Sequence, residues 1–223
     1  MRSKFNEELK LLHNALINMG SLCEMSIEMA VKALISGDSA AAEQSLPLLD
    51  EINEKEREIE SMCMKLLLRQ QPVATDLRTI SSALKMVTDL QRIGDNSGDI
   101  AEIVTMCNLS AADDTKLIQD MAKATIKMVT DSIDAFVKED TVLAKSVIEY
   151  DDVVDGFFNE IKTTLIQQFG NPHGNGEKVL DLLMIAKYLE RMADHAVEIA
   201  KWVIFSITGE KAVSPVSPIV SLK

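Results

Sequence analysis

Residues 90–95 read LQRIGD, and a closely similar stretch, LERMAD, occurs at residues 189–194. In both stretches the apolar residues are three apart, which is the spacing of an α-helix with one buried face. The polar positions recur together with the apolar ones. The recurrence therefore predicts that the chain is a duplication of one helical unit.

Further matches lie before these stretches, at one constant spacing. The positions Met19, Ile27, Val31, Ala33, Leu34 and Asp38 correspond to Met121, Val129, Ile133, Ala135, Phe136 and Asp140. The same spacing pairs Asp50 with Asp152 and Ile59 with Ile161. We interpret the chain as two tandem three-helix bundles, one for each repeat.

Periodicity and helix-breaking residues predict six long antiparallel helices, so the fold class is all-α. Their expected ranges are 3–36, 38–69, 75–107, 115–138, 140–169 and 177–207. Asp38 or Ser39 is the expected N-cap of the second helix, and a kink is expected near Pro47. The repeats should span residues 1–108 and 114–208, followed by a disordered tail at 209–223.

Composition agrees with packed helices. Apolar residues make up 47% of the 223 residues and aromatic residues only 4%, which favours aliphatic helical cores over a sandwich or barrel. The net charge of −12 argues against nucleic-acid binding and suits cations or a partner with a basic patch. The N-terminus does not resemble a signal peptide and no run of 18 apolar residues occurs, so we expect a cytoplasmic protein without direct membrane insertion.

Acidic residues four apart occur at matching places in the two repeats. Asp95 and Asp99 share one helix face in the first repeat, and Glu190, Asp194 and Glu198 share one in the second. Hard oxygen ligands at this spacing suit magnesium, calcium, manganese or iron. The expected cofactor is a divalent or trivalent metal cluster of iron, zinc, manganese or magnesium. A solvated acidic face is the alternative interpretation. Recurrence at equivalent positions is what favours a metal.

Four charged residues are candidates for contacts with a partner. Arg92 and Arg191 recur with the acids. Each either is buried and donates a bidentate pair of hydrogen bonds to a carboxylate on a neighbouring helix, or binds an anion. Asp76 and Arg78 lie at the tip between the second and third helices. They either cap the third helix or meet a partner.

No catalytic apparatus is visible in the sequence, and we expect no enzyme. The three histidines do not follow a glutamate by three residues, so the Glu-x-x-His pairs of ferritin-like di-iron enzymes are absent. There is no glycine-rich phosphate loop, dinucleotide fingerprint or nucleophile in a recognisable turn. The three cysteines lie far apart in helical contexts, which predicts buried structural thiols.

Three stretches together resemble one known family. Residues 71–78 (QPVATDLR) and 89–95 (DLQRIGD) look like the first-repeat signature of the PhoU family, and residues 189–195 (LERMADH) look like its second-repeat counterpart. The resemblance covers about residues 3–208. It implies a regulator that links the ATPase subunit of a phosphate ABC transporter to a membrane sensor histidine kinase. Such a regulator represses the phosphate regulon when phosphate is abundant. We also expect a homodimer.

The resemblance also implies a metal site, because some family members bind multinuclear metal clusters through an E(D)-x-x-x-D motif. Glu190 and Asp194 match this motif fully. In the first repeat Gln91 stands where the acid belongs, although Asp95 matches. The acids on adjacent helices that are candidates to complete a site are Asp50, Asp152 and Asp155.

Three classes of function remain open at this point. The leading hypothesis is an adaptor that binds protein partners through its helical faces. The runner-up is a metal-carboxylate protein of the helical-bundle type, used for iron storage or redox chemistry. A purely structural helical module is the third.

Overall fold

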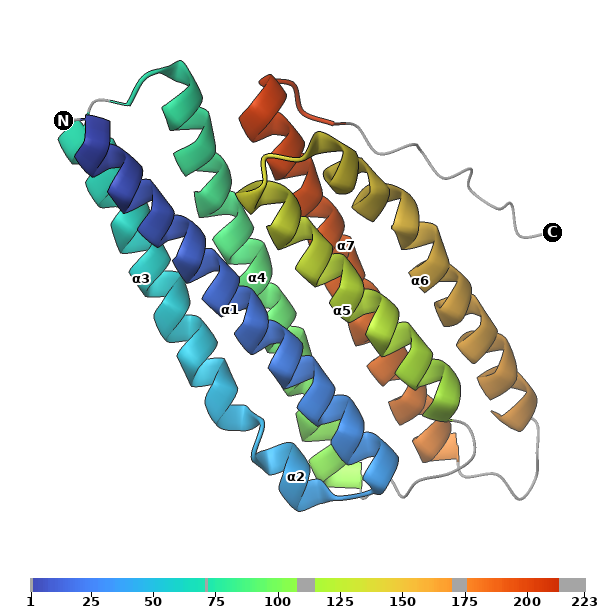
Figure 1. Cartoon of the computed structure of the whole chain (residues 1–223). Helices are drawn as coiled ribbons and strands as arrows, with labels where there is room; N and C mark the ends of the chain where they lie inside the picture. The colour runs from blue at the N-terminus through green and yellow to red at the C-terminus, as the bar shows by residue number, and fades with distance from the viewer. Residues whose placement is uncertain (1, 71, 108–114, 170–175, 213–223) are drawn as a thin grey trace.

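The computed structural model describes residues 2–70, 72–107, 115–169 and 176–212, and within these ranges the chain forms helices and no strand. Figure 1 shows the seven helices. They are α1 (Arg2–Ser36), α2 (Ser39–Glu43), α3 (Leu46–Gln70), α4 (Ala74–Cys107), α5 (Thr115–Val137), α6 (Thr141–Phe169) and α7 (Gly176–Thr208). The all-α prediction is confirmed.

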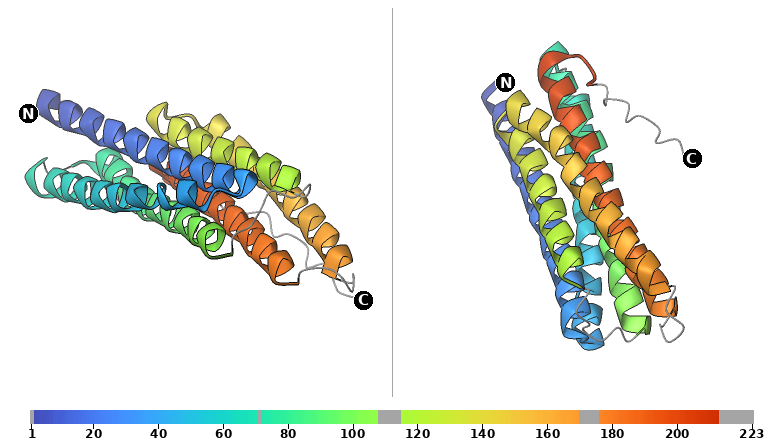
Figure 2. Two further views of the ribbon diagram at one scale, coloured as in Figure 1. Left: turned by 90° about the horizontal axis from the view of Figure 1, so that it is seen from below. Right: turned by 90° about the vertical axis from the view of Figure 1, so that its right-hand side faces the viewer.

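The long helices form two three-helix bundles that lie side by side. The first bundle contains α1, α3 and α4, with the short α2 at one end, and the second contains α5, α6 and α7 (Figures 1 and 2). The bundles meet where α4 packs on α7 and α1 packs on α5. Buried aliphatic side chains of both bundles belong to one continuous core. Each helix therefore buries one face in its own bundle. Four helices, α1, α4, α5 and α7, also form the interface between the bundles, which is called the joint below.

The predicted second helix is interrupted rather than kinked. It splits after Glu43 into α2 and α3, and Pro47 lies in the first turn of α3. Proline is tolerated at that place because the first backbone N–H groups of a helix have no acceptor within it. The hydroxyl of Ser45 donates to the carbonyl of Ala42 (2.7 Å) and closes the end of α2. Proline thus starts a helix here, where the sequence predicted a bend within one.

The turn between the first two helices of each repeat is built in the same way. Asp38 and Asp140 are the N-caps: a carboxylate oxygen of Asp38 accepts from the backbone N–H of Ala41 (3.1 Å), and one of Asp140 accepts from that of Val142 (2.8 Å). The preceding residue has left-handed backbone geometry in both turns, with φ of 65° at Gly37 and 52° at Glu139. Asp38, and not Ser39, is the cap in the first repeat.

The duplication also appears in buried hydrogen bonds. The thiol of Cys23 donates to the carbonyl of Leu90 (3.3 Å), and the hydroxyl of Thr125 donates to the carbonyl of Leu189 (3.4 Å). These residues occupy matched positions of the two repeats. Cys23 and Cys63 are buried free thiols, as the sequence predicted, and burial raises the pKa of Cys63 to about 12.

Three predicted segments fall largely outside the residues that the structure describes. They are the linker at 108–114, the loop at 170–176 apart from its last residue, and the tail beyond residue 212. Among the described helices, none has the length and apolarity needed to cross a lipid bilayer.

Candidate functional site

The second repeat gathers carboxylates from two neighbouring helices. Asp151 and Asp155 lie one turn apart on α6, and Glu190 and Asp194 lie one turn apart on α7. Burial, followed by repulsion from Asp155 and Asp194, raises the pKa of Asp151 to about 6. Burial and Glu190 also raise the pKa values of Asp155 and Asp194. These four residues are called the acidic site below.

One lysine partly offsets this negative charge. The ammonium group of Lys187 contacts a carboxylate oxygen of Glu190 and lies 5.4 Å from the ring centroid of Phe158 on α6. It lowers the pKa values of Asp155 and Asp194, but burial and the other carboxylates outweigh it. The acidic site therefore keeps an excess of negative charge that a cation or a basic side chain of a partner would relieve.

The equivalent place in the first repeat is filled by amides. Asn53 occupies the position that matches Asp155, and Gln91 occupies the position that matches Glu190. The amide nitrogen of Gln91 donates to the carboxylate of Asp95 (2.7 Å) and to the amide oxygen of Asn53 (3.3 Å). The first of these bonds gives one oxygen of Asp95 a partner within the chain. The two repeats share a backbone plan but differ in charge at this place.

Two of the five predicted metal ligands lie away from these positions. Asp99 on α4 accepts a hydrogen bond from Tyr188 on α7 and lies near Arg191, while burial, with Glu102 next in effect, raises its pKa. Glu198 is paired with the ammonium group of Lys201 at 2.6 Å. Asp99 thus belongs to the joint between the bundles, and Glu198 belongs to an ion pair on its own helix. Only Glu190 and Asp194 join the acidic site.

The predicted partner residues have different surroundings. Arg92 and Arg191 are exposed rather than buried. Asp76 lies in the first turn of α4, where its charge suits the helix dipole. Arg78 donates through Nε to the backbone carbonyl of Ser206 (3.4 Å), so it binds the C-terminal end of α7. Arg78 therefore joins the two repeats.

Sequence reasoning missed Asp151 and the partners of Asp99. The stretch at residues 151–155, DDVVD, does carry acids at the spacing of one helical turn. That signal was available, but the choice between Asp151 and Asp152 depends on how α6 is rotated against α7. Asp152 and Asp50 are exposed in the structure.

The described side chains are not arranged as a metal-binding centre. Within the described ranges, no three or more His, Cys, Asp or Glu side chains converge closely enough to hold one ion. The chemistry of the acidic site fits a hard cation, because all four of its side chains are carboxylates. Loading the acidic site would require changes of side-chain rotamer.

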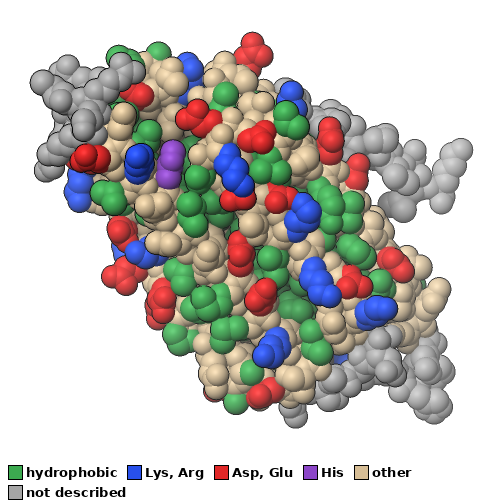
Figure 3. Space-filling view, in the orientation of Figure 1, with side chains coloured by type: hydrophobic (Ala, Val, Ile, Leu, Met, Phe, Trp, Pro, Cys, Tyr) green, Lys and Arg blue, Asp and Glu red, His purple; other side chains and the backbone are tan. Residues whose placement is uncertain are grey.

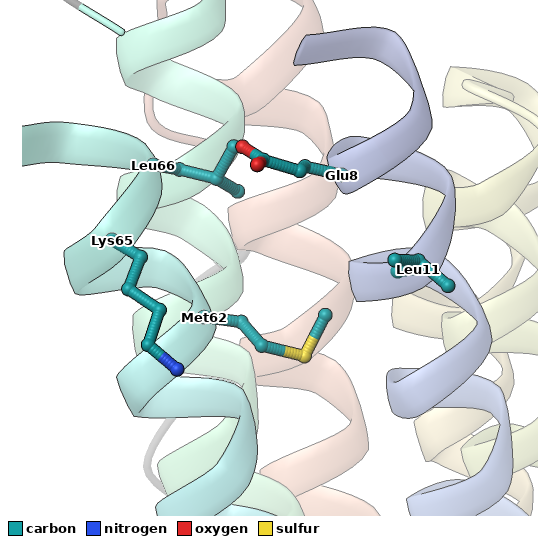
Figure 4. A pocket seen from close by; sticks show the side chains of 5 residues that line it. All are labelled: Glu8, Leu11, Met62, Lys65 and Leu66. Atoms are coloured by element: carbon teal, nitrogen blue, oxygen red, sulfur yellow. The ribbon is translucent and has the colours of Figure 1, made fainter. Parts of the chain in front are cut away.

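Other surface features are less informative about function. Figure 3 shows acidic and basic side chains interspersed over the visible face, with apolar side chains between them. Figure 4 shows a shallow recess between α1 and α3, lined by Glu8, Leu11, Met62, Lys65 and Leu66. Met62 reaches from α3 toward α1 there. The lining is mostly apolar, with Glu8 and Lys65 as its charged residues.

Comparison with known proteins supports one family. The model of the PhoU domain matches the chain twice, at residues 16–104 and 118–203. The chain is 36% identical over 208 residues to a phosphate-specific transport system accessory protein PhoU homolog of Pseudomonas aeruginosa, covering 92% of this chain and 86% of that protein. A homolog with the same description in Clostridium acetobutylicum is 34% identical, covering 94% of this chain and 97% of that protein.

Solved structures show the same relationship. The crystal structure of PhoU from Pseudomonas aeruginosa superposes with a TM-score of 0.86 at 35% identity and covers 92% of this chain and 100% of that one. The phosphate transport system regulatory protein PhoU from Streptococcus pneumoniae gives a TM-score of 0.84 at 28% identity, over 94% and 99% of the two chains. With two domain matches over most of its length and the same arrangement of helices, the chain belongs to the PhoU family.

Proposed function

We propose that this chain is a cytoplasmic, non-enzymatic adaptor that negatively regulates phosphate uptake and phosphate-regulon signalling. In this proposal it links the ATPase subunit of a phosphate ABC transporter to a membrane sensor histidine kinase. The observation that carries the proposal is membership of a family whose curated relatives are named phosphate-specific transport system accessory proteins. An adaptor needs no catalytic residues, and it needs surfaces that proteins can bind.

The acidic site is the surface that we assign to a basic partner. Burial, and after it repulsion between the carboxylates, raises the pKa values of Asp151 and Asp194, so their charged forms are held at a free-energy cost. A lysine or arginine from a partner would offset part of that cost on binding. The overall charge of −12 acts in the same direction, because it steers a positively charged surface toward the chain.

A phosphate-starvation reporter in a strain deleted for this gene tests the proposal. With abundant phosphate, the reporter should be switched on in the deletion strain and silenced again by the intact gene. The double substitution Asp151→Asn with Asp155→Asn should restore silencing poorly. A matched control, Glu43→Gln with Glu160→Gln, removes the same charge from exposed positions elsewhere. A reporter that stays silent in the deletion strain would contradict the regulatory role.

We also propose that, when no basic partner is bound, the acidic site takes up a metal cofactor. Glu190 and Asp194 would hold it together with Asp151 and Asp155, and a hard cation such as magnesium, manganese or iron, or zinc, suits these oxygens. The bound ion would neutralise the carboxylates and order their side chains. Metal analysis of untagged protein prepared without chelator should return at least one equivalent.

Substitutions separate the two repeats in this test. Asp155→Asn should abolish metal uptake, whereas Asp95→Asn should leave it unchanged, because Gln91 already donates a hydrogen bond to Asp95. Less than one equivalent in the parent protein would contradict the metal proposal and leave the adaptor role in place. Many equivalents of redox-active iron would instead favour the storage or redox alternative.

The homodimer is part of the same proposal. Light scattering should give twice the chain mass of 24.6 kDa at micromolar concentration. A mass equal to one chain would contradict the homodimer.

A further inference from the structure

A groove of about 540 Å³ lies between α6 and the last turns of α7. One wall is a single stripe of α6, and the other is formed by α7 and the residues that follow it. Its lining residues are Thr141, Lys145, Ile148, Glu149, Asp152, Ile204, Thr208, Glu210, Lys211 and Ala212. The apolar side chains of Ile148 and Ile204 lie within a rim of charged groups. This is the larger of the recesses described here.

The chain itself turns into this groove after α7 ends. Gly209 has a φ of 82°, in the left-handed region that ends a helix and reverses the direction of the chain. The ammonium group of Lys211 then lies 4.8 Å from the ring centroid of Trp202, which is more than two turns back along α7. Ala212 lines the groove and packs against the buried core. The last described residues therefore already run back along the second bundle.

The residues that follow are mostly apolar and are suited to the apolar centre of this groove. Residues 213–223 read VSPVSPIVSLK, and their only charged side chain is Lys223. Two Ser-Pro pairs favour an extended backbone rather than a helix. Eleven extended residues span at most about 36–40 Å. The wall of α6 from Thr141 to Asp152 is about 17 Å long. The segment is therefore long enough to follow the whole groove.

We propose that residues 213–223 dock in the groove between α6 and α7 of their own chain. The valine, isoleucine and leucine side chains of this segment pack on the partly exposed Ile148, above the buried Ile204, and its prolines remove backbone donors that the groove does not satisfy. The one charged side chain of the segment, Lys223, is opposite in sign to Glu149 and Asp152 of the groove. The docking itself does not depend on the proposed adaptor role.

Methyl NMR with a spin label tests the docking. The full chain with Cys107→Ser carries a label at Ser221→Cys, while Cys23 and Cys63 stay buried and slow to react. The methyl signals of Ile148 and Ile204 should lose about half or more of their intensity when the label is paramagnetic. Ile52, in the first bundle, should keep its intensity.

A matched pair of tail variants controls for non-specific contacts. Val216→Asp with Ile219→Asp places two charges on apolar positions of the segment and should restore the signals of the groove. Ser214→Asp with Ser217→Asp adds the same charge at polar positions and should leave the broadening in place. These substitutions lie outside the described helices and leave the core residues of both bundles unchanged.

Three outcomes would overturn the proposal. The first is that the groove signals keep their intensity in the labelled parent chain. The second is that both tail variants change the broadening equally, which would indicate a contact without apolar specificity. The third comes from a mixture of spin-labelled chains with separate isotope-labelled chains. Broadening in that mixture of the same size as in the single chain would place the segment on a second copy.

Discussion

Nδ1 of His195 on α7 lies 3.0 Å from a carboxylate oxygen of Asp89 on α4, and this pair joins the two repeats. Each side chain is 17% exposed, so water screens the contact only partly. The hydrogen bond lies in the interface where α4 packs on α7, one residue along the helix from Asp194. The interface between the bundles and the acidic site therefore use neighbouring residues of α7.

A double-mutant cycle should measure the interaction between Asp89 and His195. Asp89→Ala and His195→Ala should each lower the free energy of unfolding by about 0.5–1.5 kcal/mol, because each leaves a half-buried polar partner unsatisfied. The double substitution should cost less than the sum of the two, with a coupling of about 0.5–1 kcal/mol. Urea unfolding provides the measurement. Strictly additive losses would show that the two side chains do not interact in solution.

The acidic site predicts an unusual dependence of stability on pH. The pKa of Asp151 is about 6 in the folded chain against an ordinary value of 3.8, so the folded chain binds this proton more tightly than the unfolded chain does. Stability should therefore fall as pH rises through that window. Asp151→Asn removes the charge and should be about 1 kcal/mol more stable than the parent above the window, allowing for solvent screening.

Unfolding at several pH values checks this prediction. Below pH 3.8 the two proteins should be equally stable, because the aspartate is then protonated in both states. Asp152→Asn is the matched control, since this neighbour is exposed. Equal gains from the two substitutions would mean that general charge reduction, rather than the environment of Asp151, is responsible.

The left-handed residue between the first two helices differs between the repeats. Gly37 adopts this backbone geometry without strain because it has no Cβ atom. In Glu139 the Cβ atom lies close to the following carbonyl oxygen, which costs free energy. Glu139→Gly should therefore raise the free energy of unfolding by about 0.5–1 kcal/mol. Gly37→Ala should lower it by about 1 kcal/mol for the same reason. Thermal unfolding of both variants decides the matter, and a loss of stability in Glu139→Gly would refute the strain argument.

Arg78 should be a structural residue as well as a candidate for partner contact. It donates to the carbonyl of Ser206 near the end of α7, where a positive charge also suits the helix dipole. Arg78→Ala should lower the free energy of unfolding by about 1 kcal/mol. Arg92→Ala, at an exposed arginine of the same helix, should change it little. If Arg78→Ala unfolds like the parent and loses only partner binding, the capping role is wrong.

Local signals explain why much of the fold was predictable. The helix ends follow from residues that act within one turn, such as Asp140, whose carboxylate bonds the N–H groups of the next residues. The break at Pro47 was located from sequence but interpreted as a kink, because a single chain pattern does not show whether a proline lies inside a helix or at its start.

The sequence by itself determined the all-helical class, the two repeats and the motif acids Glu190 and Asp194, because helical periodicity and capping act over a few residues. The tertiary structure alone decided which acids meet. Glu198 has the same spacing from Asp194 as Glu190 does, yet it pairs with Lys201, and Asp99 turns to Tyr188. Asp151 joins the acidic site because α6 packs against α7 with that face inward. The physical reason is that spacing along one helix sets the face a residue shares, whereas the rotation and packing of neighbouring helices set what that face touches.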